Sequence, residues 1–234
     1  MIRTALRERV ARALAKIYQA IDNQALQDIE RERQRQALAS TARFVDEHLS
    51  HLQPERGPDA LFAKLSLLHR GLDMAPKDGL VLEFGVGTGF TMREIARRRL
   101  PAHGFDSFQG LPEHWRSGFT KGTFAQGLPK VGGANLHVGW FSETLPAFLA
   151  EHADTFAFVH MDADLYSSTK TVFDLAQDRF VPGTVVLFDE YFNYPGWQHH
   201  EHQAFTEFVT ESGRQCEYLG YNPLHEQVLV RIIA

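Results

Sequence analysis

The sequence predicts an α/β fold: a doubly wound, mostly parallel sheet that ends in an antiparallel hairpin and is preceded by a helical extension. Three observations support it. Apolar, strand-like runs alternate with helical patterns from residue 80 onward. Several of these runs end in acidic residues. The last two runs, 217–221 and 227–233, have no helix between them, as expected for a hairpin. We therefore divide the chain into an extension, 1–75, and a sheet domain, 76–234.

Composition narrows the possible functions. The chain has 234 residues, a net charge of −5 and no large basic block, so we expect no nucleic-acid partner. No apolar run approaches the roughly 18 residues that cross a bilayer, so we expect no membrane partner. The single cysteine, Cys216, cannot form an internal disulfide. This suits a reducing compartment, and we expect a cytoplasmic protein.

The extension carries a stripe of apolar residues spaced three or four apart. Such spacing predicts an amphipathic helix that needs a partner surface. We expect the helix to cover the sheet domain or to form a homodimer with a second copy. Arginines and alanines near the start also resemble an organellar transit peptide, which is the less favoured alternative. The stripe consists of Leu6, Val10, Leu14, Ile17 and Ile21.

The first strand of the predicted sheet ends in a glycine-rich turn. The apolar run 80–84 is followed by glycines at alternate positions and by a helical pattern from Phe90. Glycines serve where the backbone turns sharply and a ligand approaches closely, because they have no Cβ atom. A glycine turn without a ligand is the structural alternative. Phe90 stands where dinucleotide enzymes have the third glycine of G-x-G-x-x-G, which disfavours that class.

An acidic residue, Glu83, precedes these glycines at the end of the same strand. A carboxylate there would repel a pyrophosphate but suits a cationic or hydroxyl-rich ligand. The acidic-x-Gly-x-Gly-x-Gly pattern resembles motif I of the class I S-adenosylmethionine (SAM) methyltransferases, which have a Rossmann-like fold. This resemblance implies a SAM site at Glu83, Gly85, Gly87 and Gly89.

The second strand, 101–106, ends in Asp106. An acidic residue at this place in a Rossmann-like sheet can accept hydrogen bonds from both ribose hydroxyls. Capping of a turn or helix is the structural alternative for Asp106. The segment 109–134 is a long, glycine-dotted and aromatic loop, and loops of this length in compact domains are usually functional or mobile.

Two later strands also end in carboxylates. The run 156–161 leads into Asp162 and Asp164, and the run 184–188 leads into Asp189 and Glu190. Ligands of open α/β sheets bind outside the carboxyl ends of the strands, so these side chains should converge. Converging carboxylates repel one another unless a cation neutralises them, and Mg²⁺ takes six oxygen ligands. Asp162, Asp189 and Glu190 could supply three. Asp162 and Asp189 could instead cap the following helices, and Asp164 could equally cap a helix, because Ser167 and Thr169 lie near it in the sequence.

The acidic pattern is similar to that of the metal-dependent small-molecule O-methyltransferases. The closest likeness is to enzymes that methylate sugar hydroxyls of macrolide and aminocoumarin antibiotics, and the stretch 105–112 also resembles that family. The resemblance implies that Asp162, Asp189 and Glu190 bind the metal, with Mg²⁺ expected, and that Asp164 is a base. It adds Ser107 and Asp162 to the SAM contacts. The sequence departs from the family at Glu190, where those enzymes tend to have Asp.

Further along, histidines and aromatic residues follow the last acidic pair. His199, His200 and His202 do not share one helix face, so we favour a polar surface over a metal site, although His199 could act as a base. The aromatic residues are expected to form the wall of a substrate pocket rather than core. They are Tyr191, Phe192, Tyr194 and Trp197.

These observations predict an enzyme that transfers a methyl group from SAM to a hydroxyl of a small molecule with the help of a divalent metal. One alternative is a metal-independent N- or O-methyltransferase whose acidic cluster binds a cationic substrate. Another is a non-catalytic module that binds SAM or a protein partner. An NAD-dependent enzyme is the third choice, because Phe90 and the position of Glu83 disfavour it.

Overall fold

The computed structural model describes residues 14, 16 and 28–234. The predicted N-terminal stripe therefore lies outside the described residues except for Leu14, whose side chain is exposed. The arginines of the transit-peptide alternative lie outside them as well. Among the described helices, none is both long enough and apolar enough to cross a membrane.

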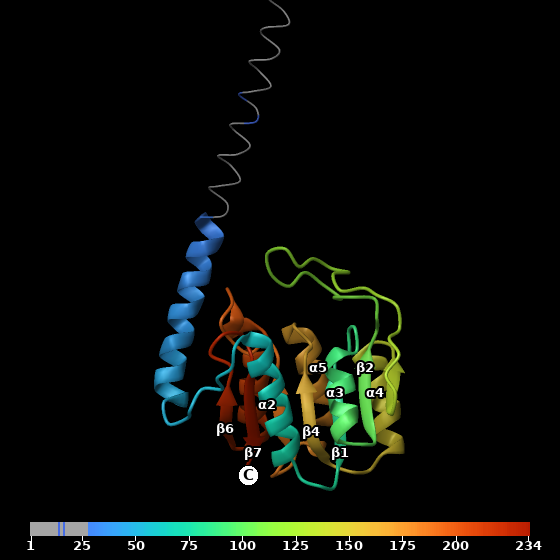
Figure 1. The fold of residues 1–234 in the computed structure, drawn as a ribbon. Helices are drawn as coiled ribbons and strands as arrows, with labels where there is room; N and C mark the ends of the chain where they lie inside the picture. The colour runs from blue at the N-terminus through green and yellow to red at the C-terminus, as the bar shows by residue number, and fades with distance from the viewer. Residues whose placement is uncertain (1–13, 15, 17–27) are drawn as a thin grey trace, which may run out of the picture.

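Seven strands form one sheet in the order β3-β2-β1-β4-β5-β7-β6 (Figure 1). The first five of that order are mutually parallel, and β7 runs antiparallel to both β5 and β6. This confirms the predicted fold class with its closing hairpin. The strands are β1 (Leu80–Phe84), β2 (Ala102–Asp106), β3 (Ala134–Val138), β4 (Phe156–Met161), β5 (Val185–Phe188), β6 (Cys216–Tyr221) and β7 (Val228–Ile232).

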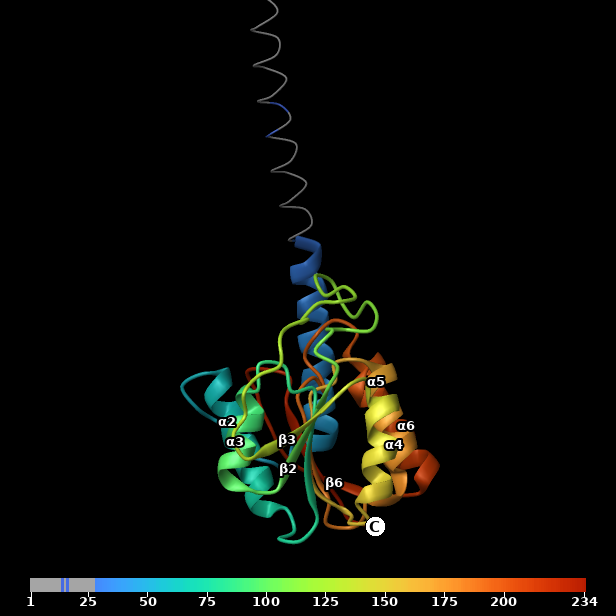
Figure 2. The ribbon, with the colours of Figure 1, turned by 90° about the vertical axis from the view of Figure 1, so that its right-hand side faces the viewer.

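Helices cover both faces of the sheet (Figure 2). The helices α2 and α3 lie on one face, and α4, α5 and α6 lie on the other. Their bounds are α2 (Ala60–Met74), α3 (Phe90–Arg98), α4 (Phe141–Glu151), α5 (Tyr166–Ala176) and α6 (Glu201–Ser212), with short 3₁₀ turns η2 (Gln177–Arg179) and η3 (Trp197–His199). Because α2 packs against the sheet, it belongs to the covering layer, and the division of the chain at residue 75 stays a prediction.

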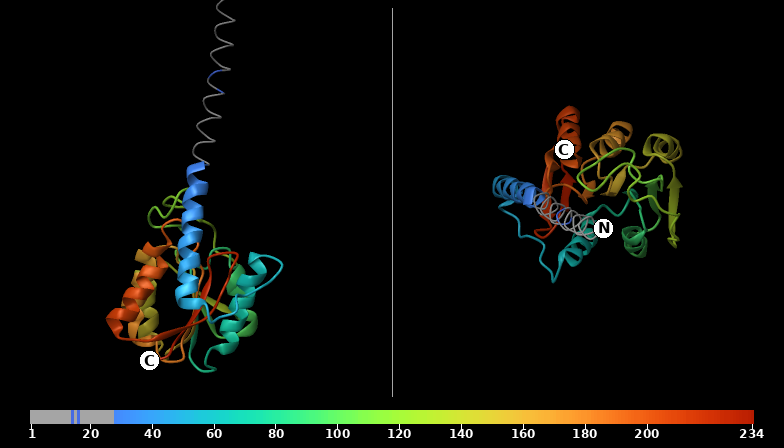
Figure 3. Two further views of the ribbon diagram at one scale, coloured as in Figure 1. Left: turned by 90° about the vertical axis from the view of Figure 1, so that its left-hand side faces the viewer. Right: turned by 90° about the horizontal axis from the view of Figure 1, so that it is seen from above.

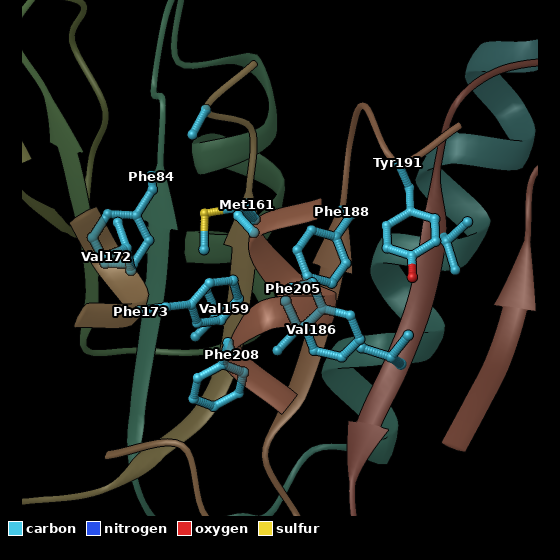
Figure 4. Close-up of a cluster of buried hydrophobic side chains, with 14 of the residues drawn as sticks. Phe84, Val159, Met161, Val172, Phe173, Val186, Phe188, Tyr191, Phe205 and Phe208 are labelled. Carbon is cyan, nitrogen blue, oxygen red and sulfur yellow. The ribbon is translucent and has the colours of Figure 1, made fainter. Parts of the chain in front are cut away.

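The central strands are continuous apolar runs in the sequence because both of their faces are buried in the core. Every residue of β1, β4 and β5 is buried, as expected for parallel strands with helices on both faces. Aromatic side chains fill the layer between the sheet and the helices α5 and α6 (Figure 4). The rings of Phe173 and Phe208 stack with centroids 4.4 Å apart, and Phe188 and Phe205 lie 5.0 Å apart. This layer holds the ends of β4 and β5 in place.

Helix α4 begins at Phe141, two residues before the glutamate of its first turn, Glu143. The side chain of Glu143 accepts a hydrogen bond from the backbone N–H of Trp140 (3.2 Å). This is how a glutamate in the first turn stabilises a helix N-terminus. The glutamate therefore marks the first turn rather than the first residue.

Residues 28–44 form a helix that ends in a π-helical turn, η1 (Val45–Leu49), beside β6 (Figures 1 and 3). This N-terminal helix packs on the loop that follows β5. Trp197 Nε1 donates to Ser40 Oγ (3.0 Å), and the N–H of Asn193 donates to Thr41 Oγ1 (2.9 Å). Phe44 contacts Trp197 edge to face, with ring centroids 5.6 Å apart. The helix is thus joined to the loop that begins with the predicted acidic pair.

Candidate functional site

A cavity of about 720 Å³ lies at the carboxyl ends of β1, β2, β4 and β5. This is the edge where open α/β sheets bind ligands. Its wall includes the glycine turn after β1, the long loop after β2, the start of α4 and the two acidic strand ends. From the predicted site the lining residues are Gly85, Gly87, Asp106, Ser107, Asp162, Asp164, Asp189 and Glu190. The predicted residues Glu83, Gly89 and His199 do not line it.

Two glycines of the turn serve different purposes. Gly85 has φ +92°, and a Cβ atom there would lie 1.7 Å from the carbonyl oxygen of Asp162. Glycine at 85 therefore lets the turn after β1 pack against the turn after β4. Gly87 has φ +51°, and the nearest atom to its added Cβ would be Gln126 Nε2 at 3.4 Å. Glycine at 87 keeps the cavity wall open to a ligand.

Asp106 ties the glycine turn to the end of β2. Its Oδ2 accepts from the N–H of Gly87 (2.8 Å), and its Oδ1 accepts from the N–H of Phe108 (2.7 Å). Each carboxylate oxygen can accept more than one hydrogen bond, so Asp106 retains acceptor capacity toward the cavity. Ser107 Oγ accepts from the N–H of Gln109 (3.1 Å). The predicted capping role and the ligand-facing position are thus compatible in Asp106.

The carboxylates after β4 and β5 converge as predicted. Their oxygens form two groupings with ligand atoms within 4.8 Å of one another: one combines Asp162, Asp189 and a ring nitrogen of His160, and the other combines Asp162, Asp164 and Glu190. Asp162 belongs to both. The predicted set of Asp162, Asp189 and Glu190 is therefore divided between two neighbouring groupings, and Asp164 joins the second one.

Crowding changes the charge state of this cluster. Burial and the nearby Asp189 carboxylate raise the pKa of Asp162 to about 7. Burial and the neighbouring carboxylates raise the pKa of Asp164 and of Glu190 well above the usual carboxyl range. Within the described residues, Glu190 Oε2 is buried without a hydrogen-bond partner, and Asp189 Oδ1 is buried with His160 Nε2 3.5 Å away. Unpartnered buried carboxylate oxygens that line a cavity fit a hard divalent cation.

Lys64, in α2, reaches into this cluster and was missed by the sequence analysis. Its Nζ lies 2.7 Å from Asp189 Oδ2 and 3.7 Å from Asp162 Oδ2. Burial alone would lower the pKa of Lys64, but the Asp189 and Asp162 carboxylates outweigh burial and raise the pKa above its ordinary value. A lysine among the apolar residues of the first half of α2 was the available indication.

Glu83 lies behind the cavity rather than in its wall. The side chain is fully buried, and Glu83 Oε1 pairs with His160 Nδ1 at 2.8 Å. His160 Nε2 lies 3.5 Å from Asp189 Oδ1. Burial alone would lower the pKa of His160, but Asp189 and Glu83 raise it to about 10. A chain of alternating charge thus connects Glu83 through His160 and Asp189 to Lys64.

A second buried carboxylate, Glu201, holds the two acidic turns together. One of its oxygens accepts from the N–H of Ala163 (3.1 Å), and the other accepts from the N–H of Glu190 (3.1 Å). Sequence analysis missed this residue because it starts α6 and stands in a polar, histidine-rich stretch. The bond to each turn holds the backbone beside Asp162, Asp164 and Glu190 in place.

The aromatic residues of the cavity wall come from the loop after β2 and from the starts of α3 and α4, not from the loop after β5. Trp115, Phe119 and Phe124 line the cavity. Arg116 is held between Trp115 and Tyr194, with its Cζ 3.9 Å and 4.5 Å from the two ring centroids. Its Nη1 donates to Glu226 Oε1 (3.0 Å), which fastens the long loop to the β6–β7 connection.

The prediction that the aromatic residues after β5 form the pocket wall is wrong. Tyr191, Phe192, Tyr194 and Trp197 are at most 3% exposed and do not line the cavity. Phe44 of the N-terminal helix packs against Tyr191, Phe192 and Trp197, whereas Tyr194 packs against Trp115. Among the histidines, His199 is exposed, whereas His202 is partly buried against Trp197, with centroids 4.9 Å apart. Burial lowers the pKa of His202 to about 4.

Comparisons with known proteins agree with this geometry. A family model described as "Methyltransferase domain" matches residues 82–191, which run from β1 to the loop after β5. Comparison with curated proteins finds no significant match. The β3-β2-β1-β4-β5-β7-β6 order places that match on a Rossmann-like sheet.

Similar solved structures include two methyltransferases. CalS11, a calicheamicin methyltransferase, shares 23% identity with a TM-score of 0.58, covering 73% of this chain and 79% of that one. The O-methyltransferase NovP shares 22% identity with a TM-score of 0.55, covering 73% and 80%. At this level of identity they establish the shared fold. Residues 82–191 thus match a methyltransferase domain and lie on a Rossmann-like methyltransferase fold, and both observations support an enzyme that uses SAM.

Proposed function

We propose that the protein transfers a methyl group from SAM to a hydroxyl of a small molecule, with a divalent cation such as Mg²⁺ at the acidic cluster. The unpartnered, buried Glu190 Oε2 carries this proposal, because it lies in a cluster of carboxylates that lines the same cavity as the glycine turn. Asp162, with Asp189 and Glu190, would hold the cation. Glu190 extends one methylene further than Asp, and the Glu201 bond to its backbone fixes where that longer side chain begins.

At the SAM side of the cavity, we assign the contacts to Gly85, Gly87, Asp106 and Ser107, with Asp162 at the boundary to the acidic cluster. Gly87 allows close approach, and Asp106 offers acceptor capacity to ribose hydroxyls. Glu83 acts through His160 and Asp189, because its carboxylate lies outside the cavity wall.

At the acceptor side, Asp164 is our candidate for the base. Its carboxyl lines the cavity, and burial with the neighbouring Asp162 and Asp189 carboxylates raises its pKa, which makes it a stronger proton acceptor than an ordinary carboxylate. His199 is a weaker candidate because it is exposed and does not line the cavity. A divalent ion held by the carboxylates would supply positive charge that favours the ionised form of an acceptor hydroxyl. The residues themselves orient the acceptor, and such positioning contributes several kcal/mol.

The class of acceptor is also a proposal. A second CalS11 structure, which shares 23% identity with a TM-score of 0.51, is described as a TDP-rhamnose 3'-O-methyltransferase. We propose a polyhydroxylated acceptor, such as a sugar, for this chain too. The aromatic side chains of Trp115, Phe119 and Phe124 offer apolar faces on which such a ring can pack.

A chelator experiment tests the proposal. SAM and a panel of glycosylated and phenolic acceptors are incubated with the protein in excess chelator, and Mg²⁺ is then restored. We expect activity to fall at least a hundredfold and to return with the metal. Asp189→Asn should show a similar loss, whereas Asp78→Asn, a matched change at an exposed position, should not. Gly87→Val should abolish SAM binding measured by calorimetry, while the chelator leaves SAM affinity nearly unchanged. Full activity in chelator would refute the metal-assisted mechanism.

A metal-independent enzyme is the second candidate, and the position of Lys64 favours it. The Lys64 ammonium already lies between Asp162 and Asp189, so the cluster can hold a cationic amine. In that case the acceptor would be an amine or a hydroxyl beside one. Methyl transfer that is insensitive to chelator and restricted to amine-bearing acceptors would support this candidate.

The assembly and the location of the protein remain proposals. We propose a cytoplasmic homodimer that pairs through the N-terminal helical region. Light scattering of the full chain and of residues 28–234 tests the pairing, because the shorter chain keeps the contacts of Ser40 and Thr41 with the sheet domain. Equal assembly of the two chains would contradict pairing through residues 1–27.

A further inference from the structure

The side chain of Lys64 occupies the centre of the acidic site although it comes from a distant element. Lys64 lies in α2, whereas its carboxylate partners follow β4 and β5. The side chain is only 19% exposed, and the side chain of Asp189 is 6% exposed. Lys64, Asp162 and Asp189 all line the same cavity. The Lys64–Asp189 ion pair is therefore part of the site rather than a surface ion pair.

The Lys64 ammonium does not contact every carboxylate of this site. Four carboxylates line the cavity here, those of Asp162, Asp164, Asp189 and Glu190. Lys64 contacts Asp162 and Asp189, whereas Glu190 Oε2 is buried without a hydrogen-bond partner among the described residues. Asp162 is shared, because its oxygens also group with those of Asp164 and Glu190. The site thus has carboxylate oxygens that can bind a second cation, in addition to the oxygens that the Lys64 ammonium contacts.

The Lys64 ammonium and a divalent ion compete for the carboxylate oxygens of Asp162 and Asp189. An ion bound by Asp162 and Asp189 needs carboxylate oxygens that the Lys64 ammonium contacts, and two cations about 4 Å apart repel each other strongly at the dielectric of a protein site. A lysine has a flexible four-carbon stem, so its ammonium can withdraw without a change in α2. The cavity provides the space.

We propose that Lys64 is a built-in competitor of the divalent ion: its ammonium and the ion occupy the Asp162–Asp189 pair alternately. Lys64 then sets how tightly the site holds the ion, and it keeps the carboxylates together when the ion is absent. This inference deepens the proposed function and rests on it for the identity of the ion. Lys64 is a positioning residue in this scheme, because it acts on the ligands and not on the acceptor.

The test is a binding measurement on the full chain. Mn²⁺ serves as the probe, and its free concentration is followed by electron paramagnetic resonance. Lys64→Met removes the charge and keeps an unbranched side chain of similar length. We expect it to bind Mn²⁺ about tenfold more tightly than the wild type, or more. Lys64→Arg restores a cation and should return the affinity toward the wild-type value.

Lys77→Met is the matched control, because Lys77 is exposed and does not line the cavity. It makes the same change in net charge and should leave the Mn²⁺ affinity within about twofold of wild type. Equal affinities in Lys64→Met and Lys77→Met would overturn the proposal. Weaker binding in Lys64→Met would overturn it too, since the lysine would then help to build the site.

A second measurement does not depend on the folding of a variant. In wild-type protein carrying isotope-labelled lysine, the Nζ resonance of Lys64 should shift when Mg²⁺ is added, because the ammonium leaves Asp189. An unchanged resonance at saturating Mg²⁺ would overturn the proposal.

The outcomes separate this inference from the proposed function. Mn²⁺ binding to Lys64→Met but not to the wild type, with chelator-insensitive activity, supports competition and refutes metal-assisted methyl transfer. Chelator-sensitive activity with equal Mn²⁺ affinities supports metal assistance and refutes competition. The absence of Mn²⁺ binding in every variant refutes both.

Discussion

Two buried histidines flank the same strand and titrate in opposite directions. His160 of β4 pairs in register with Glu83 of β1, and His103 of β2 pairs with the neighbouring Leu82. Burial alone would lower the pKa of both histidines. For His103, burial and the nearby His137 and His152 lower it to about 4. For His160, Asp189 and Glu83 reverse the effect and raise the pKa to about 10.

The difference shows that the neighbours across the sheet decide the charge of a buried histidine. Alternate side chains of a strand point to opposite faces, so Leu82 and Glu83 face different layers. His160 meets carboxylates and becomes part of a charged chain that reaches the cavity. His103 instead lies 3.1 Å from His137 Nε2 through its Nδ1 and belongs to a neutral cluster. The cluster around His160 is connected to the cavity, whereas the cluster around His103 contributes to packing.

The largest expected effect comes from breaking the charged chain. His160→Leu leaves Glu83 and Asp189 buried without their shared cation, and removing one partner of a buried ion pair typically costs about 3–5 kcal/mol. Urea unfolding of the variant measures this loss. Adding Glu83→Gln should recover part of it, because one of the uncompensated charges is then gone. A loss below about 1 kcal/mol in His160→Leu would contradict the charged chain.

A smaller effect, of opposite sign in the two regions, is expected from pH. The folded-state pKa of His103 is below the ordinary value of 6.5, so the unfolded chain binds the proton first and stability falls as pH drops from 6.5 toward 4. The folded-state pKa of His160 is above 6.5, so its contribution is complete below pH 6.5 and is lost as pH rises toward 10. The free energy of unfolding contributed by these two histidines should therefore be highest near pH 6.5 and should fall toward both lower and higher pH.

Substitution separates the two limbs of that profile. His103→Asn should flatten the acid limb and leave the alkaline limb in place. If the acid limb keeps its slope in that variant, other groups account for it.

The smallest effect is expected at the edge of the neutral cluster. His137→Leu removes one hydrogen bond between uncharged partners and keeps an apolar contact with Phe105, so it should cost about 1 kcal/mol. The same substitution therefore costs several times less at 137 than at 160. Comparable losses at the two positions, measured under the same urea conditions, would mean that charge is not the distinguishing feature.

Much of the site could be predicted because parallel strands bring their carboxyl ends to one edge. Asp106, Asp162, Asp164, Asp189 and Glu190 were all placed from strand periodicity and all line one cavity. The roles assigned to them remain proposals. The central strands could be predicted for a related reason, since continuous apolar runs indicate strands covered on both faces.

What could not be predicted depends on side chains that reach across the fold. Lys64 comes from a covering helix, 125 residues before its partner Asp189, and Glu201 bonds two turns from the start of another helix. Neither has a strand-end position to reveal it. The inward direction of Glu83 depends on His160, 77 residues later in the chain. Three of the aromatic residues after β5 were misplaced because the docked N-terminal helix packs against them, and the fourth, Tyr194, because it packs against Trp115.

That docking has a consequence for local unfolding. The N–H of Asn193 donates to Thr41, and Gln34 Nε2 donates to the carbonyl of Asn193. Exchange of the Asn193 amide with solvent deuterium therefore requires the helix to lift away first. The helix and the loop after β5, about 150 residues apart in sequence, then open as one cooperative unit. We therefore expect the Asn193 amide to exchange no faster than the opening of that helix allows.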